Sequence, residues 1–276
     1  MNHLPDNQSH IKQQYERDGF AVFQNVLHPD LIQETSNHID WLLEKHPELR
    51  PEHLHHRLVA DDPFWVRLIS DERLLDIAEI FVGSNIALFA SHYISKPPSD
   101  GQAVLWHQDG SYWPLAPMEV VTLWLAVDDS TPENGCMRAI PGTHTMPIHK
   151  MKRRTDIPNV LNSEIDTEWV DESKAVDIVI KAGGISVHHP NLIHGSNPNT
   201  SSKRRGGLTI RYIPTSTQIT SKEPWPCAFL LRGEAVAGVN SYRASPKYIE
   251  GEHMPFRGCE INNLLKVSNN THSGSQ

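Results

Sequence analysis

The chain has 276 residues and a mass of 31.2 kDa; 38% of its residues are hydrophobic and 21% are charged, which suits a globular protein with a sizeable core. Its formal net charge of −8 and pI near 6.1 argue against nucleic acid as a partner, and no apolar run approaches the roughly 20 residues that would span a bilayer. The N-terminus lacks the pattern of a signal peptide, and three scattered cysteines cannot form a disulfide framework, so we expect a cytoplasmic protein without a membrane partner. The sequence leaves the oligomeric state open.

Residues 8–85 are expected to form a mostly helical flank that contains one short strand, 20–23. A helix should begin at Pro29 and another at Pro63 after a capping Asp62, because proline suits the first helical turn and aspartate caps it. A further apolar stripe should end its helix at Gly83. The polar connector between the first two of these helices carries three histidines that we expect to be exposed: His53, His55 and His56.

From residue 86 the pattern changes to short apolar and β-branched runs separated by turn residues, which predicts a sandwich or barrel. We expect the core to extend over residues 86–215 and the whole chain, 1–276, to form one domain. The predicted strands are 86–94, 104–107, 120–127, 136–140, 175–180, 185–189 and 208–213.

Two stretches have no clear strand pattern. Residues 147–174 form a long connection of the kind that often borders an active site, and it carries a basic group at 150–154 together with Trp169. Residues 216–266 are expected to form an irregular C-terminal strap, and the polar residues 267–276 a disordered tail.

The stretch Trp106-His107-Gln108-Asp109 carries the chemistry. On a strand, the side chains of His107 and Asp109 would project from one face and could both bind one metal ion. His194, 85 residues after Asp109, is the best third ligand. Two histidines and one carboxylate bind one face of an iron ion and leave the other face open, as in non-haem Fe(II) oxygenases.

Eleven residues after His194 lies Arg205, directly before the last predicted strand. With this arginine in place, the chain resembles the phytanoyl-CoA dioxygenase family of Fe(II)/2-oxoglutarate oxygenases, over about residues 12–215. Further stretches similar to the family are Gly19–Val22, Ile94–Pro98, Glu133–Cys136 with Ile140–His144, and His194–Ser196 followed by Asn199.

The resemblance implies a double-stranded β-helix, which is a cupin-like jelly roll with flanking helices. It implies that iron, held by His107, Asp109 and His194, uses O2 and the co-substrate 2-oxoglutarate to hydroxylate a small molecule, with succinate and CO2 as co-products. Asp109 stands where related halogenases have a small residue, so we expect hydroxylation or another oxidation. Arg205 would bind the distal carboxylate of 2-oxoglutarate, with Ser196 and Trp124 beside it. Candidate substrate contacts are Trp113, Gln108 and Trp169.

Strand alternation makes a prediction about the neighbouring arginines. Arg205 should point into the barrel and Arg204 should therefore point to solvent. Arg211 lies six positions further along, an even number, so it could share the inner face and compete for the same carboxylate, unless Gly206 and Gly207 break the alternation.

Two other functions remain compatible with the residues. A zinc ion on the same three ligands would give a hydrolase, although that enzyme would have no use for Arg205 and would lack a glutamate base. A jelly-roll binding protein without catalysis would leave the triad incidental.

Overall fold

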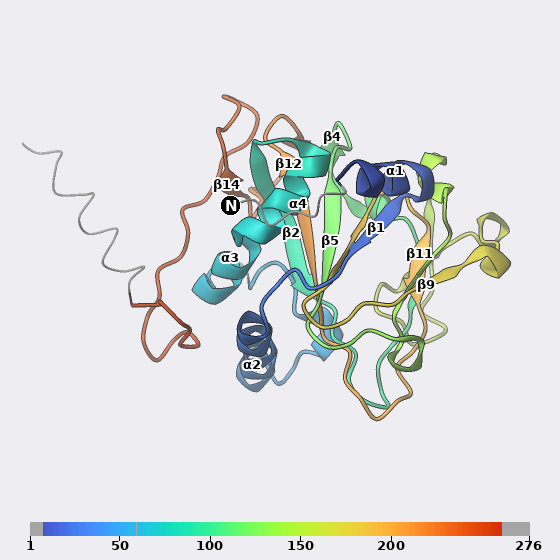
Figure 1. Cartoon of the computed structure of the whole chain (residues 1–276), viewed down its shortest axis with the longest axis horizontal. Helices are drawn as coiled ribbons and strands as arrows, with labels where there is room; N and C mark the ends of the chain where they lie inside the picture. Colours follow the sequence, from blue (N-terminus) through green and yellow to red (C-terminus); the bar gives the residue numbers. More distant parts are fainter. Residues whose placement is uncertain (1–7, 59, 261–276) are drawn as a thin grey trace, which may run out of the picture.

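The structure is a computed structural model that describes residues 8–58 and 60–260. The tail predicted at 267–276 lies outside the described residues. The first part of the chain is helical apart from one strand, and the later part is mostly strand (Figure 1). The helices are α1 (Gln8–Asp18), α2 (Pro29–Lys45), α3 (Pro63–Ile69) and α4 (Glu72–Val82).

The strands form two main antiparallel sheets that pack into a jelly roll. The larger sheet has six strands in the order β1-β10-β5-β12-β2-β14, and the smaller has four in the order β3-β11-β6-β9. The strands of the larger sheet are β1 (Phe20–Phe23), β2 (Ile86–Tyr93), β5 (Val121–Ala126), β10 (Ile185–His188), β12 (Gly207–Pro214) and β14 (Phe229–Arg232). Those of the smaller are β3 (Val104–His107), β6 (Met137–Ala139), β9 (Val176–Ile178) and β11 (His194–Ser196).

The helices cover one face of the six-stranded sheet, and the other face lines the interior of the jelly roll. In Figure 1, α2 and α3 lie toward the left of the view, and β9 and β11 lie toward the right. Alternation along each strand separates the two faces: Leu123 of β5 packs in the cluster formed with the helices, whereas Trp124 packs on the opposite side. The same alternation runs along β12, where Leu208 and Ile210 face the helices, and Thr209 faces the interior.

The N-terminal helices begin and end where the sequence predicts. Pro29 is the first residue of α2, and Asp62 caps α3 by accepting a hydrogen bond from the Trp65 backbone N–H at 2.8 Å. Gly83 ends α4 with a φ of 77°, a backbone conformation that favours glycine. No helix in the described part of the chain is both long enough and apolar enough to cross a membrane.

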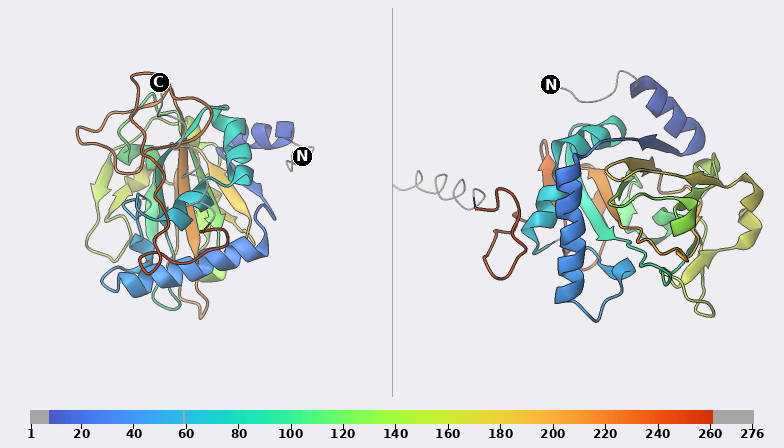
Figure 2. Two further views of the ribbon diagram at one scale, coloured as in Figure 1. Left: turned by 90° about the vertical axis from the view of Figure 1, so that its left-hand side faces the viewer. Right: turned by 60° about the horizontal axis from the view of Figure 1, so that its bottom comes forward.

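The C-terminal stretch differs from the irregular strap that we expected at 216–266. β14 pairs with β2 and completes the edge of the six-stranded sheet, and a two-residue strand at Gln218–Ile219 (β13) pairs with Leu115–Ala116 (β4). These strands are too short to show a period in the sequence. In Figure 2 the segment after β14 runs across the outside of α2 and α3, and Lys45 of α2 donates a hydrogen bond to the Glu252 carbonyl at 2.9 Å.

Two further expectations are corrected. The connection 147–174 contains a hairpin of Met151–Arg153 (β7) and Ser163–Ile165 (β8), which the turns between them hid in the sequence. The three connector histidines are half-buried, because tertiary contacts cover them; His56, for example, stacks on Trp225 with ring centroids 5.6 Å apart. Short 3-10 helices complete the chain at Pro51–His53, Asp109–Tyr112, Pro132–Asn134, Thr143–Thr145, Thr167–Trp169 and Glu172–Lys174.

Candidate active site

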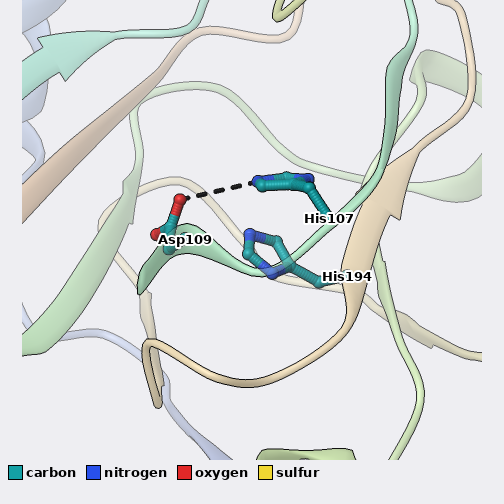
Figure 3. A group of neighbouring side chains, drawn as sticks. All are labelled: His107, Asp109 and His194. Atoms are coloured by element: carbon teal, nitrogen blue, oxygen red, sulfur yellow. Dashed lines mark ion pairs between the residues drawn. The ribbon is translucent and has the colours of Figure 1, made fainter. Parts of the chain in front are cut away.

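The structure brings His107, Asp109 and His194 together inside the jelly roll, although they come from separate segments. One ligand atom from each residue lies within 4.8 Å of the others, and all three residues are buried (Figure 3). His107 and His194 are directly opposite each other across the β3–β11 pair. Asp109 does not continue the strand as expected: β3 ends at His107, and Asp109 is the first residue of a 3-10 helix, which turns its carboxylate back toward the histidines.

Hydrogen bonds fix the orientation of both imidazoles. His107 Nδ1 lies 2.8 Å from the Leu105 carbonyl oxygen, and His194 Nδ1 lies 2.9 Å from the Leu192 carbonyl oxygen. A carbonyl only accepts, so Nδ1 carries the proton in both rings and Nε2 is left with a lone pair. Each Nε2 is therefore ready to bind a metal ion, and the carbonyl behind each ring holds it in that tautomer.

The carboxylate of Asp109 is held in its charged form. Burial by itself raises the pKa of Asp109, but the charge of Arg211 and the neighbouring imidazoles of His107 and His188 outweigh it, so the pKa lies well below its usual value. His188 Nε2 is 3.4 Å from Asp109 Oδ2, and the Thr122 hydroxyl donates to the same oxygen at 3.3 Å. Burial lowers the pKa of His188 and takes that of His194 well below the usual value, so both imidazoles are neutral at neutral pH. The neutral imidazole of His194 beside the carboxylate of Asp109 suits a divalent metal ion.

Arg205 lies in the same cavity as the three candidate ligands and is 2% exposed. Its guanidinium donates to the Gly135 carbonyl at 2.6 Å and to the Ile94 carbonyl at 2.9 Å, and it lies over the Trp124 ring, 5.2 Å from the centroid. Burial lowers the pKa of Arg205 to about 10, so it remains charged at neutral pH. No carboxylate of the described residues forms an ion pair with it, and its Nε has no hydrogen-bond partner. A buried cation without a counter-ion is costly, so this site suits an incoming carboxylate.

Three of the stretches that resemble the family lie around Arg205: Ile94–Pro98, Glu133–Cys136 and Asn199. Its backbone N–H donates to the Lys96 carbonyl at 3.0 Å, and its carbonyl accepts from the Lys96 N–H at 2.9 Å. Asn199 donates through its side chain to the carbonyls of Pro97 at 3.0 Å and Lys203 at 2.7 Å, which ties the two segments together. These stretches therefore fix the backbone of Arg205, and its side chain points into the cavity.

The other predicted residues fall into two groups. Ser196 and Trp124 line the cavity beside Arg205. Gln108 and Trp169 do not: Gln108 is buried and bonds only to the backbone of Pro147, His149 and Asn191, and Trp169 is 41% exposed and stacks on His149. Trp113 does not line the cavity either. Its ring lies under the guanidinium of Arg211, and Arg211 does line the cavity.

The arginine neighbours follow the alternation with one correction. Arg205, Thr209 and Arg211 all line the cavity, so the two glycines do not break the alternation. Arg204 points the opposite way, but it is not free in solvent: its guanidinium pairs with Asp128 at 2.7 Å and with Asp40 at 2.9 Å. The sequence missed these pairs because Asp40 lies on α2, far away in the chain.

The cavity also contains side chains that sequence reasoning did not select. His92, on β2, lines it, as does His188, on β10. Burial and the neighbouring Arg211 take the pKa of His92 well below its usual value. The cavity has a volume of about 60 Å³.

Comparison with known proteins agrees with this geometry. The family model "Phytanoyl-CoA dioxygenase (PhyH)" matches residues 15–207. Phytanoyl-CoA dioxygenase 1 of Oryza sativa subsp. japonica is 31% identical over 192 residues, which are 67% of this chain and 66% of the relative. A probable alpha-ketoglutarate-dependent hypophosphite dioxygenase of Stutzerimonas stutzeri is 30% identical over 58% of this chain and 54% of its own length. The match thus spans about half to two thirds of these curated relatives.

Solved structures share the fold. The apo form of the non-heme monooxygenase ThoJ superposes with a TM-score of 0.74 at 22% identity, covering 94% of this chain and 95% of that one. The predicted jelly-roll fold and family are confirmed, and the relatives provide no support for a zinc hydrolase or a binding module. The chain belongs to the phytanoyl-CoA dioxygenase (PhyH) family.

Proposed function

We propose that this protein is a non-haem Fe(II)- and 2-oxoglutarate-dependent dioxygenase that oxidises a small molecule. His107, Asp109 and His194 would hold the iron, and Arg205 would hold the distal carboxylate of 2-oxoglutarate. The observation that carries the proposal is one cavity that contains three buried ligand side chains and a buried guanidinium without a carboxylate partner. The named relatives, one of them an alpha-ketoglutarate-dependent dioxygenase, support the same reaction class.

Each group of the site has a distinct part in that reaction. Iron(II), with 2-oxoglutarate and O2, supplies the oxidant for hydroxylation and releases succinate and CO2. The protein contributes the orientation of the ligands through the Leu105 and Leu192 carbonyls. Arg205 and Trp124 fix one end of the co-substrate by a charge-assisted pair and a ring wall. Ser196, at the same end, could add a hydrogen bond from its hydroxyl.

A hydrolase based on zinc fits the cavity less well. Asp109 is the only carboxylate among the described residues that line the cavity, and as a metal ligand it would not be available as a base. The buried charge of Arg205 would also have no partner in that reaction.

The sequence-based expectations of a cytoplasmic location, and of no nucleic-acid or membrane partner, remain proposals.

Anaerobic titration tests the function. The wild-type protein should develop a weak visible absorption band only when both Fe(II) and 2-oxoglutarate are present, and in air it should release succinate. Asp109→Ala should remove the band and succinate release, because an essential negative ligand is lost. If Asp109→Ala kept normal turnover, the ligand assignment would be wrong; if Zn(II) alone supported hydrolysis, the proposed reaction class would be wrong.

A further inference from the structure

Arg211 is a second buried guanidinium in the cavity, and the proposed 2-oxoglutarate site does not use it. It is 5% exposed and lies on β12 six residues after Arg205. Six residues of extended chain separate the two Cα atoms by about 20 Å. The two side chains also meet different walls, because Arg205 stacks on Trp124 and Arg211 lies over Trp113, 5.1 Å from the ring centroid. The guanidinium groups therefore belong to separate parts of the cavity.

The contacts of Arg211 hold it in place without satisfying it. One terminal nitrogen is 3.0 Å from the Thr209 hydroxyl and 3.2 Å from His92 Nδ1, and both partners are uncharged acceptors. The other terminal nitrogen is 3.8 Å from Asp109 Oδ1, which is an ion pair but too long for a hydrogen bond. The buried Nε has no partner in the structure. Arg211 thus has unused donors inside the cavity.

The charges in the cavity would not balance once iron and 2-oxoglutarate are bound. The metal ion would be balanced by Asp109 and by one carboxylate of 2-oxoglutarate, and Arg205 by the other carboxylate. Arg211 would then share Asp109 with the metal, and the charges lining the cavity would sum to one net positive charge. A buried, unpaired cation is unfavourable, and an oxyanion that accepts from its free donors would remove the cost.

We propose that Arg211 is the receptor for an anionic group of the prime substrate, so that this enzyme oxidises a small molecule carrying a carboxylate or a phosphorus oxyanion. The inference rests on the proposed function, because the charge argument requires iron and 2-oxoglutarate in their sites. Trp113 then acts through Arg211, by holding the guanidinium flat, and not as a direct substrate contact.

The test uses small probes in the wild-type protein, held without O2 and saturated with Fe(II) and 2-oxoglutarate. Acetate, methylphosphonate and the uncharged acetamide are each titrated, with the visible band and the heat of binding as readouts. Acetate and acetamide have nearly the same shape, so a preference for acetate reports charge. We expect acetate or methylphosphonate to bind about tenfold or more tightly than acetamide, and the stronger of the two identifies the oxyanion.

Two variants separate the arginines. Arg211→Gln should weaken binding of the preferred anion about tenfold to a hundredfold, while the Kd of 2-oxoglutarate changes by less than about threefold. Arg205→Gln should do the reverse. Arg211→Lys, which keeps the charge, should retain part of the anion binding even if Arg211→Gln does not fold.

Each other outcome has a defined meaning. The proposal is overturned if acetamide binds as tightly as the anions, if no anion binds, or if Arg211→Gln weakens 2-oxoglutarate as much as Arg205→Gln does. It is also overturned if Arg211→Gln leaves anion binding unchanged. A wild-type protein that forms no visible band with Fe(II) and 2-oxoglutarate contradicts the proposed function itself, independently of the probe results.

Discussion

At the scale of single residues, the site is built from side chains whose positions are set by backbone carbonyls. His107 and His194 each donate a hydrogen bond from Nδ1 to the carbonyl two residues earlier in the chain. Arg205 donates to two carbonyls from distant segments. These hydrogen bonds are made within the protein itself, so the side chains are preorganised before any ligand binds. Changes to one such residue should therefore affect binding far more than folding.

Arg205 and Arg204 provide a matched comparison. Arg205→Ala should raise the Kd of 2-oxoglutarate about a hundredfold, because loss of a buried charge-assisted pair costs a few kcal/mol and each 1.4 kcal/mol is a factor of ten. Arg204→Ala should leave that Kd unchanged. It should lower the free energy of unfolding by about 1 kcal/mol or less, since its pairs with Asp128 and Asp40 are partly exposed. Titration of the visible band and urea unfolding measure the two effects. The assignment fails if Arg204→Ala is the variant that weakens 2-oxoglutarate.

Gly207 leaves the space in which Trp124 lies. A Cβ at residue 207 would be 2.1 Å from Trp124 Cζ2, so Gly207→Ala must displace the indole that packs against Arg205. We expect Gly207→Ala to weaken 2-oxoglutarate binding about tenfold, by moving the ring wall. The effect should largely disappear when Trp124 is already replaced by alanine. An equal loss in both backgrounds would show that the steric contact is not the cause.

At the scale of elements, α2 and α3 are joined by a buried polar network. His38 on α2 lies 2.9 Å from Asp62 Oδ2 through Nε2 and 3.1 Å from the Tyr93 hydroxyl through Nδ1. Asp62 also caps α3, so one carboxylate connects two helices and β2. A fully bonded buried network specifies how the helices dock on the sheet, and removing one member leaves others without partners.

Asp62→Ala should lower the free energy of unfolding by about 2–4 kcal/mol, because the cap is lost and buried His38 loses its acceptor. Asp71, which caps α4 by accepting from the Arg73 N–H at 3.1 Å, provides the control. Asp71→Ala should cost only about 1 kcal/mol, since no buried group depends on it. Urea unfolding measures both, and equal losses would contradict the role assigned to the network.

The same network predicts a pH dependence. Burial alone raises the pKa of Asp62, but the hydrogen bond from His38 and that from the Trp65 N–H outweigh it, so the pKa is lowered from 3.8. A lowered carboxyl pKa stabilises the folded state above the unfolded value, and this stabilisation is lost as pH falls through the folded value. The stability difference between wild type and Asp62→Asn should therefore be constant above about pH 5. The difference in the free energy of unfolding should become smaller only as the pH falls below 3.8. A difference that already narrows between pH 7 and pH 5 would assign the effect to another group.

At the scale of the whole molecule, the C-terminal stretch is part of the sheet that supports the site. β14 covers the edge of β2, and Phe229 is 1% exposed within the same hydrophobic cluster as the helices. β2 in turn carries His92 to the cavity. β14 thus stabilises β2, the strand that carries His92 into the site.

Phe229→Ala should lower the free energy of unfolding by about 3–5 kcal/mol, the usual cost of emptying a buried phenylalanine site. Leu230, the next residue of β14, is 38% exposed because it faces the other way. Leu230→Ala should cost less than about 1 kcal/mol. Thermal or urea unfolding gives both values, and a small effect of Phe229→Ala would mean that β14 is not part of the cooperative core.

The sequence alone determined the local structure and the family. The N-terminal helices follow from caps and prolines, the main strands from apolar runs, and the two sites at 107–109 and 194–205 from ordered motifs, because all of these are signals within a few residues. Tertiary structure decided what distant segments share: the pairing of β14, the partners of Arg204, and the burial of Gln108 against two backbone segments. It also decided that Arg211 enters the cavity over Trp113. Strand alternation determines which side chains share a face of a strand. Only the packing of the two sheets determines which charged side chains are buried without a partner.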